Sequence, residues 1–216
     1  MNELMAVSAT SESGAATRAD LVEAGRKLFG QKGFDGASIR AITSEAGANL
    51  GAVTYHFGSK RGLYSAVLES GLRPMAARVR RAVASDGTAR ERMLRVVEAY
   101  FDHFEDHPDL PHLLLQEVAA GKRPPDVVLE IIGQVKDTVA GLQTEGVQDG
   151  SVRPGHPLLT ALSVVSQPIY LTLVAPLLAI VGGVDLSNPE VRQLTRQHVL
   201  DFVNAGLEPR SKSPFP

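Results

Sequence analysis

One segment constrains the fold of this chain more than any other, and it runs from Ser38 to Lys60 as SIRAITSEAGANLGAVTYHFGSK. In its first half, Ile39 and Ile42 are apolar residues three positions apart. In its second half, Val53 and Phe57 are apolar residues four positions apart. These spacings place apolar side chains on one face of a helix. The segment therefore predicts two short amphipathic helices in close succession.

The residues between these two helices are suited to a tight turn. Gly47 can adopt the positive φ that such a turn needs. Asn49 can cap the next helix by accepting a hydrogen bond from a backbone amide, and Ser59 can cap the helix after it. Two short helices joined in this way form a helix-turn-helix, whose second helix can enter a major groove. DNA is therefore the first partner to consider.

A longer pattern surrounds this motif at fixed offsets, and its members are Leu28, Phe29, Gly33, Phe34, Ser38, Ile42, Thr43, Ala46, Gly47, Ala48, Asn49, Thr54, Tyr55, His56, Phe57, Ser59, Lys60 and Leu63. This pattern resembles the DNA-binding region of the TetR family of bacterial transcriptional regulators. The match covers about 50 contiguous residues, which makes it far more specific than a single glycine-rich motif. Three residues depart from the family pattern: Thr43 and Gly25 stand where Ala is usual, and Thr54 stands where Tyr is usual. We expect Thr54 to change which bases are read.

The resemblance implies two groups of DNA contacts. The residues expected to touch the phosphate backbone offer hydroxyl, imidazole or ammonium groups, and they are Ser38, Tyr55, His56 and Lys60. The residues expected to face bases are small or apolar, and they are Asn49, Leu50, Gly51 and Thr54. Such side chains suit thymine methyl groups better than bidentate recognition of guanine. Helix capping by Ser38 and a core position for the Tyr55 ring are the alternatives.

Charge is distributed unevenly along the chain, although the formal net charge is only −2. Residues 17–95 contain fourteen Lys or Arg against seven Asp or Glu, a balance of +7. Residues 96–216 contain eight against fifteen, a balance of −7. A locally positive region attracts a phosphate backbone even when the whole chain is acidic. The basic half contains the helix-turn-helix, which favours DNA binding over a merely solvated basic face.

The rest of the chain predicts further helices and no sheet. A helix is expected from Thr17, which opens a capping box with Asp20, to Gly30. A long helix is expected from Ser59 to about Ala84, with a bend where Gly71 and Pro74 interrupt it. The prediction is an all-α chain of about nine helices, with an N-terminal three-helix DNA-binding domain and a C-terminal helical domain for ligand binding and dimerisation. The expected bounds are a flexible tail at 1–16, the two domains at 17–63 and 64–207, and a C-terminal tail at 208–216.

A run without Asp, Glu, Lys or Arg lies between Arg153 and Asp185 and is long enough to span a bilayer. Its hydroxyl and amide side chains, two interior prolines and lack of an aromatic belt argue against a membrane. An apolar helix outside lipid must be covered by protein. The resemblance implies that this is the penultimate helix, which pairs with the last helix and their copies in a four-helix dimer interface. The last helix is expected to start at Asn188 and Pro189.

Candidates for a ligand pocket come from helices that line the cavity in similar proteins, and they are Tyr100, His103, Phe104, His112, Gln116, Gln167 and Tyr170. Together they would form an apolar pocket with a few polar groups. His103 and His107 are four residues apart, a spacing that could hold a metal, but a plain core position is the better interpretation. No metal and no cofactor are expected.

The chain lacks the sequence motifs of common enzymes. It has no cysteine, no G-x-S-x-G elbow, no P-loop and no G-x-G-x-x-G. We therefore expect a cytoplasmic, homodimeric transcriptional regulator rather than an enzyme. The favoured interpretation is a repressor that a small, largely apolar effector releases from a palindromic operator in double-stranded DNA. The alternatives are a membrane-anchored helical protein, or a helical small-molecule-binding protein or enzyme that retains the motif.

Overall fold

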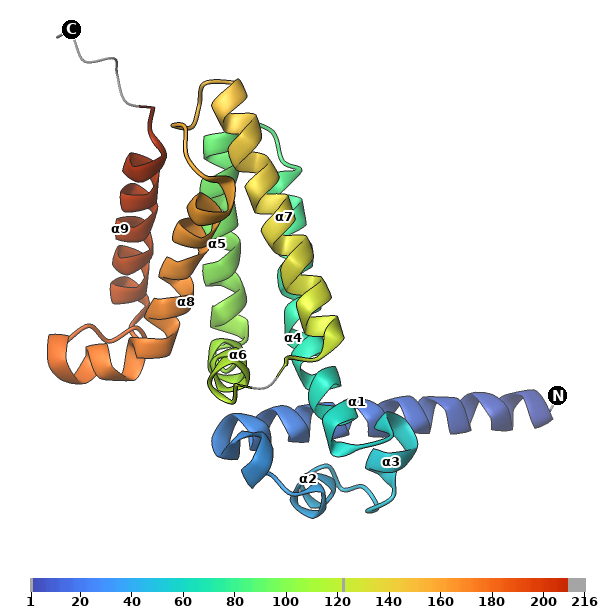
Figure 1. The fold of residues 1–216 in the computed structure, drawn as a ribbon. Helices are drawn as coiled ribbons and strands as arrows, with labels where there is room; N and C mark the ends of the chain where they lie inside the picture. Colours follow the sequence, from blue (N-terminus) through green and yellow to red (C-terminus); the bar gives the residue numbers. More distant parts are fainter. Residues whose placement is uncertain (1, 122, 210–216) are drawn as a thin grey trace, which may run out of the picture. The chain divides into compact units, whose positions relative to one another are not determined.

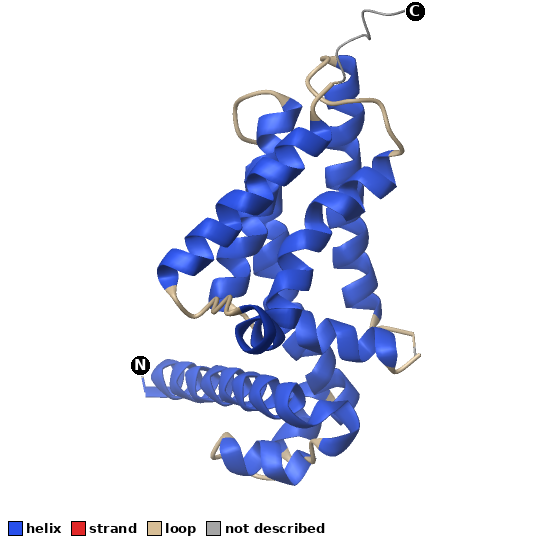
Figure 2. Ribbon diagram, turned by 90° about the vertical axis from the view of Figure 1, so that its left-hand side faces the viewer, coloured by secondary structure: helices blue, strands red, loops and turns tan. Residues whose placement is uncertain are grey.

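The computed structural model describes residues 2–121 and 123–209, and within them every regular element is a helix (Figures 1 and 2). The prediction of an all-α chain with about nine helices is confirmed for this part of the chain. The helices are α1 (Asn2–Gly36), α2 (Ile39–Glu45), α3 (Ala52–Phe57), α4 (Lys60–Val83), α5 (Ala89–Asp106), α6 (Leu110–Ala119), α7 (Asp126–Gln148), α8 (Pro157–Gly182) and α9 (Pro189–Leu207).

The chain forms two compact units. The first unit consists of Met1–Gly71 and His112–Val128, and the second unit consists of Leu72–Pro111 and Leu129–Pro216. The sequence predicted one boundary near residue 63 instead. The difference arises because most of α6 and the first residues of α7 belong to the same compact unit as the helix-turn-helix, although they are distant from it in the sequence.

Helix α1 differs from the prediction at its start. Its backbone is helical from Asn2, so residues 2–16, which were expected to form a tail, belong to a helix. Thr17 lies inside this helix, and the predicted helix start with a capping box at Thr17 is wrong. At the other end, Gly33 has φ 69° and ψ 174°, which interrupts the helix before its last residues. The sequence predicted the end of this helix at Gly30, three residues before this break.

The turn of the helix-turn-helix is largely as predicted. Gly47 has φ 62°, the conformation that the turn was expected to require. Ser38 caps α2, since its hydroxyl oxygen accepts a hydrogen bond from the amide of Ala41 at 3.1 Å. The predicted cap at Asn49 is wrong: α3 starts at Ala52, its N-cap residue is Gly51, and no side chain caps it. Asn49 instead accepts a bond from Ala52 through its backbone oxygen, at 3.1 Å.

The core of the first unit unites α1 with the helices that follow it. Ile42 and Val53 are fully buried, so each short helix is anchored by an apolar residue that the sequence pattern indicated. The Phe29 ring meets the Tyr64 ring edge-on, with centroids 4.9 Å apart. This geometry is favourable for aromatic pairs. It ties α1 to the first turns of α4.

Helix α4 begins where the sequence predicted. The Ser59 hydroxyl accepts a hydrogen bond from the Gly62 amide at 3.0 Å, which satisfies one of the free amides of its first turn. The helix continues through Gly71 and Pro74 to Val83. It belongs to the first unit as far as Gly71 and to the second unit from Leu72 onward.

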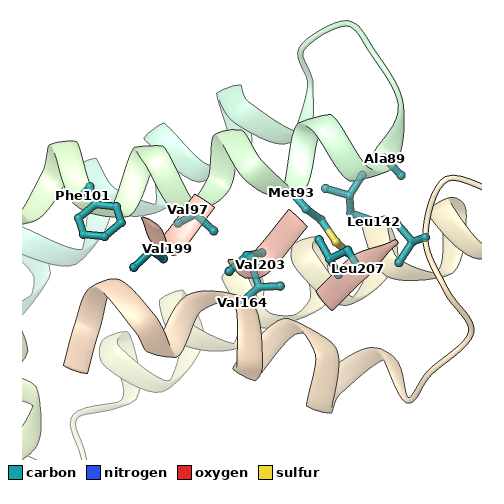
Figure 3. Close-up of a cluster of buried hydrophobic side chains, with 10 residues drawn as sticks. Ala89, Met93, Val97, Phe101, Leu142, Val164, Val199, Val203 and Leu207 are labelled. Carbon is teal, nitrogen blue, oxygen red and sulfur yellow. The ribbon is translucent and has the colours of Figure 1, made fainter. Parts of the chain in front are cut away.

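The second unit is organised around α5, against which α8 and α9 both pack (Figure 1). Helix α5 starts with a full capping box between Thr88 and Glu91. Figure 3 shows its core, in which Met93 and Val97 of α5 meet Val164 of α8 and Val203 of α9. The apolar residues that recur at helical spacing along α5 and α7 are buried as well.

Helix α8 remains largely exposed despite its apolar sequence. Within the described residues it is the one helix that is long and apolar enough to cross a membrane, a test that core helices of soluble proteins also pass. Its last turns run in a different direction from its first turns (Figure 1), and Pro168 and Pro176 lie inside it. Proline removes a backbone hydrogen bond and bends a helix. Together with α9 it exposes several large apolar side chains: Leu158, Leu159, Leu162, Tyr170, Leu177, Ile180, Val181, Leu194 and Phe202.

Candidate nucleic-acid interface

Helix α3 has one side in the core and one side exposed. Ala52 and Val53 are buried, while Thr54 is exposed and the Tyr55 side chain is 85% exposed. The turn before the helix is exposed as well, and Leu50 is 61% exposed there. A large aromatic or aliphatic residue so exposed on a short helix indicates a contact surface. The residues predicted to face bases therefore lie together on an exposed surface.

The candidate phosphate contacts lie around this surface. The His56 ring is partly buried and packs edge-on against the Tyr55 ring, with centroids 4.8 Å apart. The Ser38 hydroxyl already accepts the capping bond from Ala41, yet its own proton can still be donated. The capping role and the phosphate contact expected for Ser38 are thus compatible.

Lys60 lies at the first turn of α4. Its amino group is 4.6 Å from the centroid of the Phe34 ring and 3.4 Å from the backbone oxygen of Asp35. The second contact is long for a hydrogen bond. A lysine ammonium has three donors, so these contacts leave donors for a phosphate oxygen. Lys60 is positioned beside the end of α1 rather than extended into solvent.

Two further cations belong to this region, and sequence reasoning missed them. Arg40 is exposed on α2. Arg18 of α1 is exposed, and its guanidinium carbon lies 5.1 Å from the centroid of the Phe57 ring at the end of α3. The basic character of residues 17–95 was the only available signal, and it does not distinguish these two from other arginines. Lys27 is not counted among these cations, because its amino group already pairs with Glu45 at 2.5 Å.

An ion pair that the sequence did not predict lies behind the interface. The Arg61 guanidinium of α4 meets the Glu117 carboxylate of α6 with two parallel bonds, Nη1 to Oε1 at 3.1 Å and Nη2 to Oε2 at 3.2 Å. Burial, the Glu117 charge and a hydrogen bond with Glu117 together raise the pKa of the Tyr64 hydroxyl, against an opposing effect of Arg61. Tyr64 therefore stays neutral next to this pair.

The candidate effector residues on α5 are parts of a packed core. Tyr100, His103 and Phe104 are buried, and the Tyr100 and Phe104 rings meet edge-on with centroids 5.7 Å apart. Burial raises the pKa of the Tyr100 hydroxyl. The rings of His103 and His107 are 4.6 Å apart, but no group of three possible metal ligands occurs among the described residues.

The other effector candidates lie elsewhere. Gln167 lines an open groove of about 800 Å³ between α8, α9 and the loop before α8, and Phe202 lines it too. None of the α5 candidates lines this groove. Tyr170 is 63% exposed on α8, and His112 and Gln116 lie on α6 in the first unit. The structure therefore does not gather the seven predicted residues around one cavity.

Sequence comparison assigns both halves of the chain. The family model described as bacterial regulatory proteins of the tetR family matches residues 21–67. The model described as the tetracyclin repressor-like C-terminal domain matches residues 90–203, which is more than half of the chain. The chain belongs to the TetR family. This confirms the resemblance seen in residues 28–63, and it extends the assignment to the helices of the second unit.

Related TetR-family proteins are transcriptional regulators rather than enzymes. The transcriptional activator FasR of Mycolicibacterium smegmatis is 28% identical over 129 residues, which cover 54% of this chain and 59% of FasR. The transcriptional regulator BetI of Paraburkholderia phymatum is 34% identical over 86 residues, which cover 39% of this chain and 44% of BetI. The chain thus spans about half the length of these curated relatives.

Solved structures share the complete TetR-family fold. A tetR-family regulatory protein from Rhodococcus RHA1 superimposes with a TM-score of 0.74 at 19% identity, covering 90% of this chain and 98% of that protein. The ketosteroid transcriptional regulator KstR2 of Mycobacterium tuberculosis gives a TM-score of 0.72 at 21% identity, covering 88% of this chain and 94% of KstR2. At such identities the likeness supports the fold alone.

Proposed function

We propose that this TetR-family chain is a cytoplasmic homodimer that represses transcription from a palindromic operator, and that a small, largely apolar effector releases it from the DNA. The observation that carries the proposal is the exposed surface of α3. Leu50 and Tyr55 are large side chains held out of the core by the burial of Ala52 and Val53. A helix presented in this way suits the major groove and the phosphates beside it.

Dimerisation is supported by the exposed apolar face of α8 and α9. Leu159, Leu162 and Phe202 are each more than half exposed, and Leu194 on α9 is 71% exposed. An apolar patch of this kind on a soluble protein indicates an interface. Two copies related by a two-fold axis would present two α3 helices to successive grooves, roughly 34 Å apart.

The effector part of the proposal rests on the aromatic and apolar character of the second unit. Helix α5 places Tyr100, His103 and Phe104 in its core. An apolar effector would have to open or enlarge this core, and the few polar groups there would orient it. The alternative entry is the groove between α8 and α9 that Gln167 lines.

Two directions of regulation, repression and activation, have to be distinguished. Among the relatives, FasR is an activator, while BetI is described simply as a regulator. A promoter fused to a reporter gene separates the two outcomes, because deletion of a repressor raises expression and deletion of an activator lowers it. We propose repression, and lower expression after deletion would contradict that proposal.

Selection of bound sequences from random DNA tests the central proposal. We expect enrichment of one palindromic sequence, a footprint over both half-sites and a dimer by light scattering. Failure to enrich any sequence would contradict DNA-binding regulation. Solubility without detergent in the same preparation would exclude the competing interpretation of α8 as a membrane anchor.

A further inference from the structure

The ion pair between Arg61 and Glu117 joins two segments that lie 56 residues apart. Arg61 is the second residue of α4, and Glu117 lies near the end of α6. Both residues belong to the first unit, which also contains the helix-turn-helix. The pair therefore connects α6 directly to the segment that follows α3.

The surroundings of Arg61 hold its side chain in one place. In addition to the two bonds to Glu117, Nη2 donates to the backbone oxygen of Arg123 at 3.1 Å. The guanidinium carbon lies 5.5 Å from the Phe34 ring centroid and 5.7 Å from the Tyr64 ring centroid. A planar guanidinium can stack on rings and bind a carboxylate with two bonds at the same time. The Arg61 side chain is 36% exposed, but these contacts hold its guanidinium against the protein.

Glu117 depends on this partner. Its side chain is only 5% exposed, so its charge has little access to water. A buried charge without its partner strongly destabilises its surroundings. The pair therefore has one strongly preferred geometry, in which the first turn of α4 is held against α6.

This geometry bears on the DNA surface because α3 and α4 are almost continuous. Helix α3 ends at Phe57, and only Gly58 and Ser59 separate it from Lys60. The Gly58 amide bonds to the Thr54 oxygen at 3.0 Å, and the Leu63 amide bonds to the Ser59 oxygen at 3.0 Å. Each of these bonds closes the end of its own helix, so only Gly58 and Ser59 link the two helices. The link is tightly packed, since a Cβ added at Gly62 of α4 would lie 2.0 Å from the Phe57 oxygen, and a shift of the first turn of α4 therefore displaces the end of α3.

We propose that Glu117 is a positioning residue for DNA binding, which fixes α3 and Lys60 in their DNA-binding orientation by holding Arg61 in a bidentate ion pair. Glu117 touches no DNA in this proposal, and Arg61 acts through the fold rather than through a phosphate. The inference rests on the proposed DNA-binding function.

The test compares operator binding by the full-length wild type and by Glu117→Gln, which keeps the size of the side chain and removes its charge. We expect Glu117→Gln to weaken operator binding about tenfold or more, because the charged pair that sets the orientation is lost. We expect the dependence of affinity on salt to stay unchanged, because no phosphate contact is removed. Unfolding curves establish that each variant is folded at the temperature of the binding assay. Wild-type affinity for Glu117→Gln in the folded state would overturn the proposal.

A double-mutant cycle distinguishes positioning from direct contact. If the pair acts as a unit, Arg61→Ala, Glu117→Ala and the double variant lose similar amounts of operator affinity. If Arg61 touches a phosphate instead, its removal lowers the salt slope by about one and the two losses add. Additive losses with a changed slope would overturn the proposal.

Asp106→Asn is the matched control. Like Glu117→Gln, it removes the carboxylate partner of an arginine on α4, since Arg78 Nη2 lies 2.5 Å from Asp106. This ion pair belongs to the second unit rather than the first. We expect it to leave operator affinity unchanged.

Hydrogen exchange separates failure of this inference from failure of the proposed function. We expect Glu117→Gln to speed amide exchange in residues 52–64 and to leave α5 unchanged, whether or not an operator is found. A chain that selects no DNA but shows this local loosening contradicts the proposed function. A chain that selects DNA but shows no loosening contradicts the positioning role.

Discussion

Val53 and Tyr55 lie two residues apart on α3 and have opposite environments: Val53 is fully buried, and Tyr55 is 85% exposed. The first anchors the helix in the core of the first unit, and the second stands on the surface that we assign to DNA. The same short helix is thus fixed on one side and available on the other. Lys60 and Ser38 border this surface with groups that can donate to phosphate oxygens.

Removal of the Lys60 ammonium should weaken binding to all DNA sequences alike. Lys60→Ala takes away one expected phosphate contact, so the salt slope of binding should fall by about one unit. Titrations with operator and with unrelated DNA at several salt concentrations measure both effects. Lys136→Ala serves as the control, because Lys136 is exposed on α7 and pairs only locally with Asp137 at 2.8 Å. A Lys60→Ala variant with the wild-type slope would show that Lys60 stays on Phe34 in the complex.

The turn at Gly47 should tolerate no side chain without loss of stability. Its φ of 62° lies in the left-handed region, although an added Cβ would meet no atom within 4 Å. Gly47→Ala should therefore cost about 1–2 kcal/mol from backbone strain alone. Gly141→Ala is the control in the opposite direction, because Gly141 is helical with open space around it and Ala should stabilise it by about 0.5–1 kcal/mol. Urea unfolding of both variants measures the difference, and equal stabilities would contradict the strain argument.

Local patterns of the sequence predicted the helix-turn-helix well. The positive φ of Gly47 and the burial of Ile42 and Val53 follow from residues a few positions apart. The start of α1 was predicted wrongly because Thr17 and Asp20 have capping chemistry that a helix interior also accepts. Capping residues indicate where a helix can begin, but they do not require it to begin there.

Local sequence patterns did not predict the contacts between segments that lie far apart in the chain. Arg61 and Glu117 form a pair only because α6 lies beside the first turn of α4, and nothing near either residue indicates this. The positions of the effector candidates relative to one another were not predicted by local patterns either. Tyr100 and Gln167 were grouped by resemblance, but the structure places one in a core and the other beside a surface groove.

A charge on the exposed face of α9 should break the proposed dimer. The Phe202 side chain is 64% exposed and lines the groove between α8 and α9, so Phe202→Asp leaves the core of the subunit intact. Burying a carboxylate in an apolar interface is strongly unfavourable. Light scattering should therefore report a monomer, and circular dichroism should show normal helix content. Ile132→Asp on α7, also an exposed apolar position, should remain dimeric. A dimeric Phe202→Asp would move the interface away from α9.

The capping box of α5 should make stability depend on pH in the acid range. The pKa of Glu91 lies below its ordinary value, mainly because its carboxylate accepts a hydrogen bond from the Thr88 amide. A lowered pKa in the folded state means that the carboxylate stabilises the fold above the unfolded pKa, and that this stability is lost as the pH falls through the folded pKa. A side-chain hydrogen bond with Thr88 is the second cause of this lowered pKa. Thr88→Ala removes the side-chain bond and keeps the backbone bond, so part of the lowering is lost. An NMR titration of Glu91 should then show a higher pKa, and an unchanged pKa would contradict the assignment to the cap.

The middle of α4 offers a place where movement of the second unit could reach the DNA surface. The part of α4 that belongs to the first unit ends at Gly71, and Pro74 lies one turn further along the helix. Proline cannot donate to the carbonyl four residues before it, so α4 lacks one backbone hydrogen bond here. An effector releases DNA only to the extent that it favours one conformation over another.

Replacing Gly71 and Pro74 with Ala should stiffen α4 and reduce effector-induced release more than it reduces effector-free operator affinity. Arg80→Ala, an exposed change on the same helix, is the control. Operator affinities are measured with and without an inducing compound found by thermal-shift screening. A double variant with the wild-type ratio of these affinities would show that Pro74 is a static feature of the helix, and that the two units are coupled by another route.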